Sequence, residues 1–219
     1  MLIPMWAQHK VKSNYEKYSQ VRSTSGKTGR EVAEEILHAN GIYDVDVVKG
    51  EGFLTDHYDP NKKVVCLSPA NFDRPSVAGT AIAAHEVGHA IQHQQGYAFL
   101  RFRTALVPLA NIGSSLSYIV IMAGIFLTAL GSAFGSTALW IGAGLMSLAV
   151  LFSIVTLPVE FDASSRAMKQ ITALNIVNEK EYKHARKVLS AAAMTYVAAT
   201  ATAVAELVRI ILLARASDN

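Results

Sequence analysis

The dominant pattern along the chain is one long apolar stretch. Residues 104–159 contain no Asp, Glu, Lys, Arg or His. As a single helix this stretch would be about 84 Å long, whereas the hydrocarbon core of a bilayer is roughly 30 Å thick. We therefore expect a helical hairpin in the membrane, with spans near 109–130 and 137–157 and a turn at 131–136.

The N-terminal segment carries weaker signals. Residues 1–8 are apolar but too short to cross a bilayer, which needs about 20 apolar residues. They are interpreted as the end of an anchor or as an interfacial foot. Residues 13–27 are polar and are expected to form a connector. Thr28 and Glu31 then match a capping box, which predicts a helix that ends at Asn40.

A small sheet and a second helix are predicted next. Three short apolar segments predict strands, at 45–47, 53–55 and 64–67. The turn signal at 59–61 joins the last two segments into a hairpin. Residues 77–95 then have a helical pattern, capped by Asp73 or Ser76 and ended by Gly96.

After the apolar stretch, a polar helix is expected to run from 160 to about 187. A second uncharged stretch, 188–205, follows and leads into Glu206 and Arg209, whose spacing on a helix lets them neutralise one another. We favour membrane insertion of this last helix over packing as a soluble helix.

These patterns predict a mainly α membrane protein with a small β-hairpin or sheet, in which a catalytic core sits on a helical membrane bundle. Five segments are expected: an anchor remnant and connector (1–27), an N-terminal catalytic lobe (28–105), a transmembrane hairpin (106–158), a polar helix region (159–187) and a C-terminal apolar helix (188–219).

Composition agrees with a membrane location. Hydrophobic residues make up 51% of the chain and charged residues 17%, below the roughly 25% of typical soluble domains. The net charge of +3 comes from scattered basic residues, so no nucleic-acid partner is expected. The single cysteine, Cys66, excludes an intramolecular disulfide and is interpreted as a structural residue.

Flanking charge predicts the orientation of the hairpin. Arg101 and Arg103 precede its first span, Arg166 and Lys169 follow the second, and the turn carries no charge. The positive-inside rule therefore places both outer ends at the cytoplasmic face of a multi-pass protein of the cell membrane.

The clearest candidate for chemistry is the motif His85-Glu86-Val87-Gly88-His89. Two histidines four residues apart on a helix leave the same face and can bind one metal ion, while Glu86 is close enough to act on a water bound there. Chance would produce this pattern about 0.01 times in a chain of this composition. The motif predicts one zinc ion held by His85 and His89.

A catalytic zinc usually has a third protein ligand. His93 lies about 12 Å from His85 along a helix, so one ion cannot reach both. Glu160 is favoured, because a hairpin returns it to the membrane face where the His-Glu helix enters, and because an acid at the edge of a span needs a partner. Asp162 could orient a ligand histidine, or it could be a solvated charge.

Four segments together carry a family resemblance: LTDHYDP, AAHEVGHAIQH, ALVPLANIGS and PVEFDASSRA. In this order they resemble the YugP-type neutral zinc membrane peptidases of bacteria, a family similar to the heat-shock membrane proteases and CAAX prenyl endopeptidases. The resemblance implies a gluzincin, with His85, His89 and Glu160 as ligands and Glu86 as the catalytic acid. One departure is Ser164, where related gluzincins often have Asp.

The resulting hypothesis is a zinc metalloendopeptidase that cleaves protein or peptide substrates near the cytoplasmic membrane surface through a metal-activated water. The hairpin at 51–67 is expected to receive the substrate by strand addition. His57, Tyr58 and Tyr196 are candidates for stabilising the oxyanion. Two alternatives stay open: a zinc-binding membrane scaffold without activity, and a zinc hydrolase of a non-peptide substrate.

Overall fold

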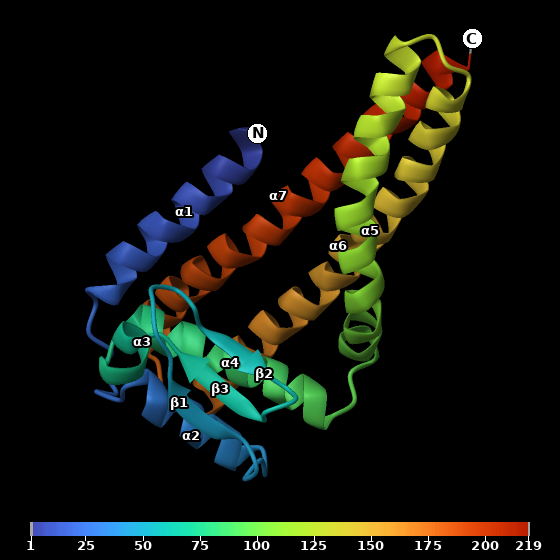
Figure 1. Cartoon of the computed structure of the whole chain (residues 1–219). Helices are drawn as coiled ribbons and strands as arrows, with labels where there is room; N and C mark the ends of the chain where they lie inside the picture. The colour runs from blue at the N-terminus through green and yellow to red at the C-terminus, as the bar shows by residue number, and fades with distance from the viewer. Residues whose placement is uncertain (1, 219) are drawn as a thin grey trace.

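The computed structural model describes residues 2–218 and consists of a lobe joined to a long helical stalk (Figure 1). The elements follow in chain order: α1 (Leu2–Ser19), α2 (Gly29–Ala39), β1 (Asp46–Lys49), β2 (His57–Asp59), β3 (Val64–Leu67), α3 (Pro69–Asp73), α4 (Val77–Gln94), α5 (Ala98–Ala129), α6 (Phe134–Ala173) and α7 (Glu179–Ser217). The chain is thus mainly helical with one small sheet, as expected.

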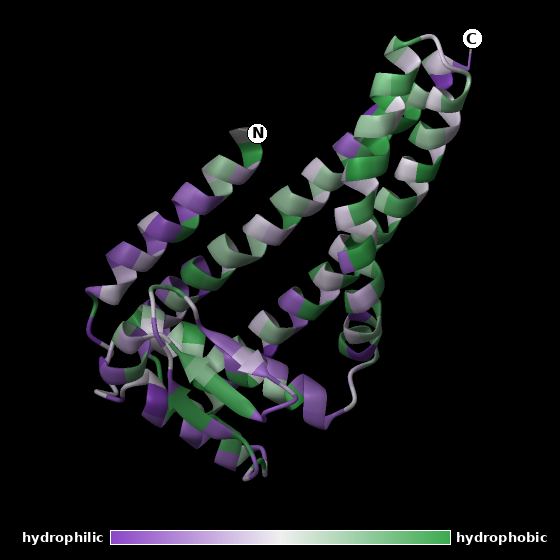
Figure 2. Cartoon of the chain, viewed as in Figure 1, coloured by the Kyte–Doolittle hydropathy of each residue, from purple (hydrophilic) through white to green (hydrophobic). Residues whose placement is uncertain are grey.

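The stalk is formed by α5, α6 and α7. Within residues 2–218 these three helices are long and apolar enough to cross a membrane. The residues of these helices are largely hydrophobic, whereas α1 and the lobe carry most of the hydrophilic residues (Figure 2). The molecule is therefore a membrane protein. The predicted hairpin is confirmed, and its turn contains Gly131 with a φ of 74°, a backbone conformation that favours glycine.

The lobe is built on a three-stranded sheet in the order β1-β3-β2. β1 runs parallel to β3, and β2 pairs with β3 as an antiparallel hairpin in which His57 lies opposite Cys66. The predicted strand at 53–55 is wrong. Gly52 and Leu54 have φ values of 92° and 55°, which an extended strand cannot contain, so β2 begins later, at His57.

Capping side chains define the helices of the lobe as predicted. Thr28 and Glu31 form the reciprocal capping box of α2. Ser76, and not Asp73, caps α4 by accepting a hydrogen bond from the Gly79 amide at 3.0 Å. The apolar face of α2 packs against β3 and α4 to form the core of the lobe, whose fully buried side chains include Val32, Ile36, Val65, Leu67 and Val77.

Two expectations about the polar segments are corrected. Residues 13–19 belong to α1 and are not a connector, because Tyr15 and Tyr18 are buried against the rest of the lobe and α1 packs along α7 (Figure 1). The predicted helix from 160 to 187 is interrupted at 174–178. There Asn175 adopts a φ of 53° and Asn178 starts α7 with a capping box.

Candidate metal centre

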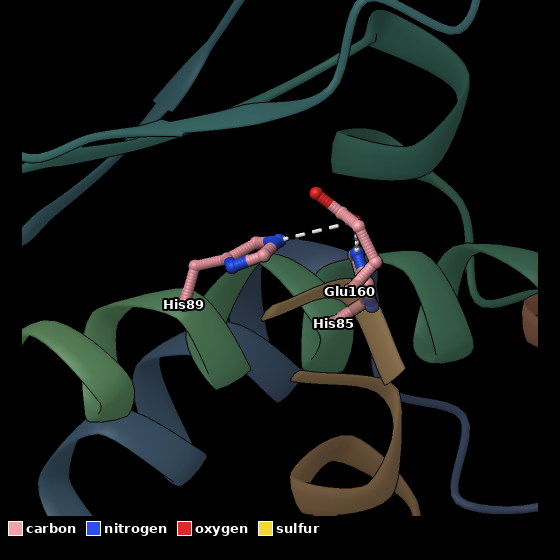
Figure 3. A group of neighbouring side chains, drawn as sticks. All are labelled: His85, His89 and Glu160. Carbon is pink, nitrogen blue, oxygen red and sulfur yellow. Dashed lines mark ion pairs between the residues drawn. The ribbon is translucent and has the colours of Figure 1, made fainter. Parts of the chain in front are cut away.

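Three side chains from two helices converge at one point in the structure. His85 and His89 project from α4, and Glu160 projects from α6 (Figure 3). One potential ligand atom from each residue lies within 4.8 Å of the other two. The Nε2 atoms of His85 and His89 are 3.3 Å and 3.6 Å from Glu160 Oε2. The two residues of the motif and the favoured acid are therefore brought together.

A close contact between α4 and α6 sets this geometry. Gly88 lies between the two histidines, and a Cβ placed on it would be 2.6 Å from the carbonyl oxygen of Ala163. Only a glycine tolerates such an approach. The backbone of α6 consequently lies directly against the helix that carries the histidines, which brings Glu160 within reach of both.

The donor atoms fit a shared cation. Glu160 Oε2 is buried and has no hydrogen-bond partner, an arrangement that is costly in a protein without a cation at that atom. Both imidazoles use their Nδ1 atoms elsewhere: His85 Nδ1 is 3.1 Å from Ser164 Oγ, and His89 Nδ1 is 3.0 Å from Gln92 Oε1. Two imidazole nitrogens and one carboxylate, with Nε2 free, form a donor set typical of catalytic zinc.

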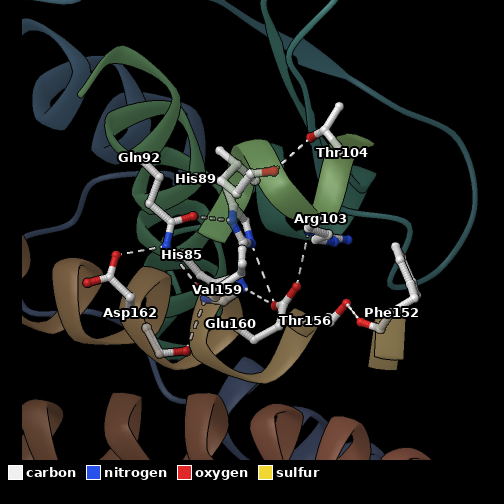
Figure 4. A network of polar contacts seen from close by, with 12 residues as sticks. His85, His89, Gln92, Arg103, Thr104, Phe152, Thr156, Val159, Glu160 and Asp162 are labelled. Atoms are coloured by element: carbon white, nitrogen blue, oxygen red, sulfur yellow. Dashed lines mark hydrogen bonds and ion pairs between the residues drawn. The ribbon is translucent and has the colours of Figure 1, made fainter. Parts of the chain in front are cut away.

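Gln92 is a residue of this site that the sequence did not reveal. Its side chain is fully buried, and its oxygen accepts a hydrogen bond from His89 Nδ1. Its amide nitrogen donates to the carbonyl oxygen of Val159 and to Asp162 Oδ2, each at 2.8 Å (Figure 4). Asp162 is also paired with Arg166. Asp162 thus acts on His89 indirectly, through Gln92.

Ser164 stands at the position where related gluzincins often have Asp. Its hydroxyl contacts His85 Nδ1, so it can orient that imidazole in place of a carboxylate. The two ligand histidines are therefore held by different neutral side chains, Ser164 for His85 and Gln92 for His89.

A cation that the sequence analysis used only for membrane orientation also reaches the site. Arg103 Nη1, from α5, lies 3.6 Å from Glu160 Oε1, the oxygen that faces away from the histidines (Figure 4). The Glu160 carboxylate is thus placed between a guanidinium on one side and two imidazoles on the other. Nothing in the local sequence around Arg103 indicates this contact, because it depends on the folding of the whole hairpin.

Glu86 lies beside the three converging side chains. It is 8% exposed, and burial raises the pKa of its carboxyl above the usual range, while His85 and His89 act in the opposite direction. It lines two cavities that meet at the site, with volumes of about 470 Å³ and 290 Å³. A buried carboxyl with access to both cavities is suited to proton transfer.

The oxyanion candidates and His93, which the sequence also singled out, lie in different places. His57 and Tyr196 line the larger cavity, with His57 Nδ1 held 2.8 Å from the Thr55 carbonyl oxygen. The Tyr58 hydroxyl lies 2.8 Å from His93 Nδ1, and burial together with the charges of Asp44 and Asp59 raises its pKa to about 12. His93 therefore pairs with Tyr58, away from the metal centre.

Comparison with known proteins agrees with this geometry. A family model described as "Putative neutral zinc metallopeptidase" matches residues 1–215. The chain is 44% identical over 211 residues to a protein of Bacillus subtilis (strain 168) described as "Putative membrane protease YugP", an alignment that covers 96% of this chain and 91% of that protein. No solved structure matches the chain significantly.

Proposed function

Because the chain belongs to the neutral zinc metallopeptidase family, we propose that it is a membrane-anchored zinc endopeptidase that hydrolyses peptide bonds at the cytoplasmic surface of the cell membrane. The observation that carries the proposal is the convergence of His85, His89 and Glu160 around a buried carboxylate oxygen without a hydrogen-bond partner. Glu86 lies beside this group, where a hydrolase of this kind needs an acid–base residue.

His85, His89 and Glu160 would hold one zinc ion. When bound, zinc supplies Lewis acidity, which lowers the pKa of water towards about 7 and polarises a carbonyl group. Three protein ligands leave a further coordination position open, which distinguishes a catalytic site from a structural site closed by four ligands. This difference favours the peptidase over a scaffold with a structural metal.

Glu86 is the proton carrier of the proposed reaction. Its carboxylate accepts a proton from the attacking water and then donates it to the nitrogen of the leaving amine. Burial raises the pKa of this carboxyl above its usual range, which favours uptake of a proton from water. Its position between two cavities lets peptide lie on either side of the bond that breaks.

The edge of the sheet supports binding of an extended peptide. β2 lies at the end of the strand order, and no other described strand pairs with its outer edge. His57 and Tyr58 of β2 line the larger cavity together with His85 and His89. A peptide that added to β2 as a further strand would therefore pass directly over the metal centre.

Two side chains are proposed to stabilise the oxyanion. Tyr196 borders both cavities, and His57 has its Nε2 available because Nδ1 contacts the Thr55 carbonyl oxygen. The Tyr196 hydroxyl can donate a hydrogen bond to the oxygen of the scissile carbonyl. His57 can donate from Nε2 only as the imidazolium, because its Nδ1 proton is bonded to the Thr55 carbonyl oxygen. Tyr58 is less suitable, since its hydroxyl already pairs with His93.

The test combines metal content with hydrolysis. The full chain is purified in detergent, its zinc is measured, and cleavage of casein is compared between the native protein and Glu86→Gln. We expect Glu86→Gln to keep its zinc and to lose activity by a factor of about 10²–10⁴, the usual contribution of a general base. Glu160→Ala is expected to lose zinc.

Three other results would contradict parts of this proposal. Equal cleavage by the native protein and Glu86→Gln would rule out the mechanism. Retained zinc without Glu86-dependent hydrolysis of any peptide would support the scaffold, or a hydrolase of another substrate. Full zinc occupancy in Glu160→Ala would exclude Glu160 as a ligand.

A further inference from the structure

The smaller of the two cavities at the site has a distinct composition. It has a volume of about 290 Å³ and lies between α1, α4, α6, α7 and the segment before β2. Its apolar wall is formed by Val11, Leu54, Ile82, Val188, Leu189, Ala192 and Ala193. Seven of the fifteen residues that line the cavity are thus aliphatic.

Apart from Tyr196 and the side chains of the metal centre, the polar groups that line this cavity are already hydrogen-bonded inside the protein. Four of them have intramolecular partners: Tyr15 bonds Asn71, Asp56 accepts from Ser68 and Asn71, Ser164 contacts His85, and Thr195 donates to the Ala192 carbonyl oxygen. A polar side chain that entered the cavity would lose its hydration and find few free partners, which is unfavourable. An apolar side chain would lose nothing comparable.

The cavity is continuous with the place where hydrolysis is proposed. It shares five lining residues with the larger cavity beneath β2, namely Asp56, His85, Glu86, Glu160 and Tyr196. A peptide that passes from β2 over the metal centre therefore places the side chain of the residue next to the scissile bond at the mouth of the smaller cavity.

We propose that this cavity is the main specificity pocket of the enzyme and accepts a large aliphatic or aromatic side chain of the residue next to the scissile bond. The inference rests on the proposed peptidase function. The volume corresponds to roughly ten water molecules, so Ala or Gly leaves most of it unfilled, whereas Leu, Met or Phe displaces this water. Filling it favours cleavage beside large apolar residues.

Asp56 also lines the cavity, and its negative charge makes the basic side chain of a substrate the strongest competitor of an apolar one for this pocket. Both oxygens of this carboxylate accept hydrogen bonds from neutral donors of Ser68 and Asn71. Its charge is thus stabilised by oriented dipoles, and no cation within residues 2–218 forms an ion pair with it. The remaining wall would not compensate the lost hydration of a lysine or arginine.

The pocket predicts a measurable selectivity. A proteome-derived peptide library is digested with the full chain in detergent, and the cleavage sites are mapped by mass spectrometry. Synthetic peptides that differ only at the selected position are then compared by kcat/KM. We expect Leu or Phe to exceed Ala at least tenfold, because each methylene in an apolar pocket is worth roughly 10–200-fold.

Two variants connect the selectivity to this cavity. Ala192→Leu fills the pocket from α7 and should shift the preference towards small residues, without loss of zinc. Ala199→Leu, at an exposed position of the same helix, should leave the profile unchanged. Leu54→Ala removes another lining side chain, widens the pocket and should raise the relative rate for the largest side chains.

The outcomes separate this inference from the proposed function. Glu86-dependent cleavage with no apolar preference, or with a preference for Lys or Arg, would overturn the pocket assignment and leave the peptidase intact. The same holds if Ala192→Leu and Leu54→Ala fold, bind zinc and keep the native profile. Absence of Glu86-dependent cleavage would overturn both.

Discussion

Gln92 uses both its amide oxygen and its amide nitrogen on the metal centre and its surroundings. Its oxygen accepts from His89 Nδ1, and its nitrogen donates to the Val159 carbonyl oxygen and to Asp162. An amide oxygen can only accept, so the proton of His89 is held on Nδ1 and the lone pair of Nε2 faces Glu160. Gln92 therefore fixes the tautomer that a metal ligand requires.

Replacing Gln92 is expected to weaken zinc binding. Gln92→Leu keeps a side chain of similar size but removes the acceptor for His89, and loss of such a contact typically reduces metal affinity 10–100-fold. The measurement is competition with a chelator in detergent. Gln94→Leu, an exposed position on the same helix, is the control and should bind zinc as the native chain does. Unchanged affinity in Gln92→Leu would contradict this role.

Local sequence identifies some of these residues and not others. The spacing of His85 and His89 is sufficient to place them on one face of a helix, because helical periodicity is a local property. Gln92 lies on the same helix, but its role in the site depends on contacts with Val159 and Asp162, which belong to α6. Contacts between distant segments have no local pattern, and for this reason Gln92 and Arg103 were not predicted as part of the site.

The contact between α4 and α6 is the element-level feature on which the metal centre depends. Gly88 and Ala163 bring the two backbones together, and Glu160 precedes Ala163 by one helical turn on α6. Any side chain at position 88 would push α6 away from α4. Displacement of α6 would move Glu160 relative to both histidines.

We expect Gly88→Ala to lower both stability and zinc affinity. The added Cβ would lie 2.6 Å from the Ala163 carbonyl oxygen, and overpacking of this kind typically costs about 1–3 kcal/mol. Thermal unfolding and chelator competition measure the two effects. Gly144→Ala on α6 is the control, since its Cβ would meet nothing within 4 Å, and it should leave both quantities unchanged. A native zinc affinity in Gly88→Ala would show that the helix contact does not position Glu160.

Sequence predicted the strongly periodic and capped elements better than the polar ones. The capping box at Thr28 and the charge-free stretch specify α2 and the membrane hairpin through local chemistry. α1 was missed because its polar residues 13–19 are stabilised by tertiary contacts of Tyr15 and Tyr18. The break at 174–178 was missed because its cause is the backbone of Asn175 and the cap at Asn178, within an otherwise helical composition.

At the scale of the whole molecule, one continuous helix connects the membrane to the metal centre. α6 begins at the tip of the hairpin and includes Glu160 without interruption (Figure 1). Since the second span was predicted to end near residue 157, Glu160 lies about 5 Å further along the helix. We therefore expect α6 to place the centre close to the membrane surface, on the side of the lobe.

The orientation of the protein in the membrane is predicted from the residues that flank α5, α6 and α7. Arg101, Arg103, Arg166 and Lys169 flank the spans on the side of the lobe, which favours a cytoplasmic lobe. At the opposite end, Trp140 Nε1 donates to Asp218 Oδ2 at 3.0 Å, so the end of α7 lies beside the start of α6. With three spans, the hairpin tip and the end of α7 should both face the outside.

Single cysteines introduced into a Cys66→Ser background test this arrangement in intact cells. A membrane-impermeant maleimide should label Ala133→Cys at the tip and Ala216→Cys near the end of α7 from outside. Lys62→Cys, on the exposed turn of the β-hairpin, should react only after the membrane is permeabilised. The opposite pattern would place the lobe outside, so its substrates would be extracellular. Labelling of Ala216→Cys only after permeabilisation would show that α7 does not span the bilayer. The end of α7 would then lie on the lobe side of the membrane and the start of α6 on the other, which contradicts the contact between Trp140 and Asp218.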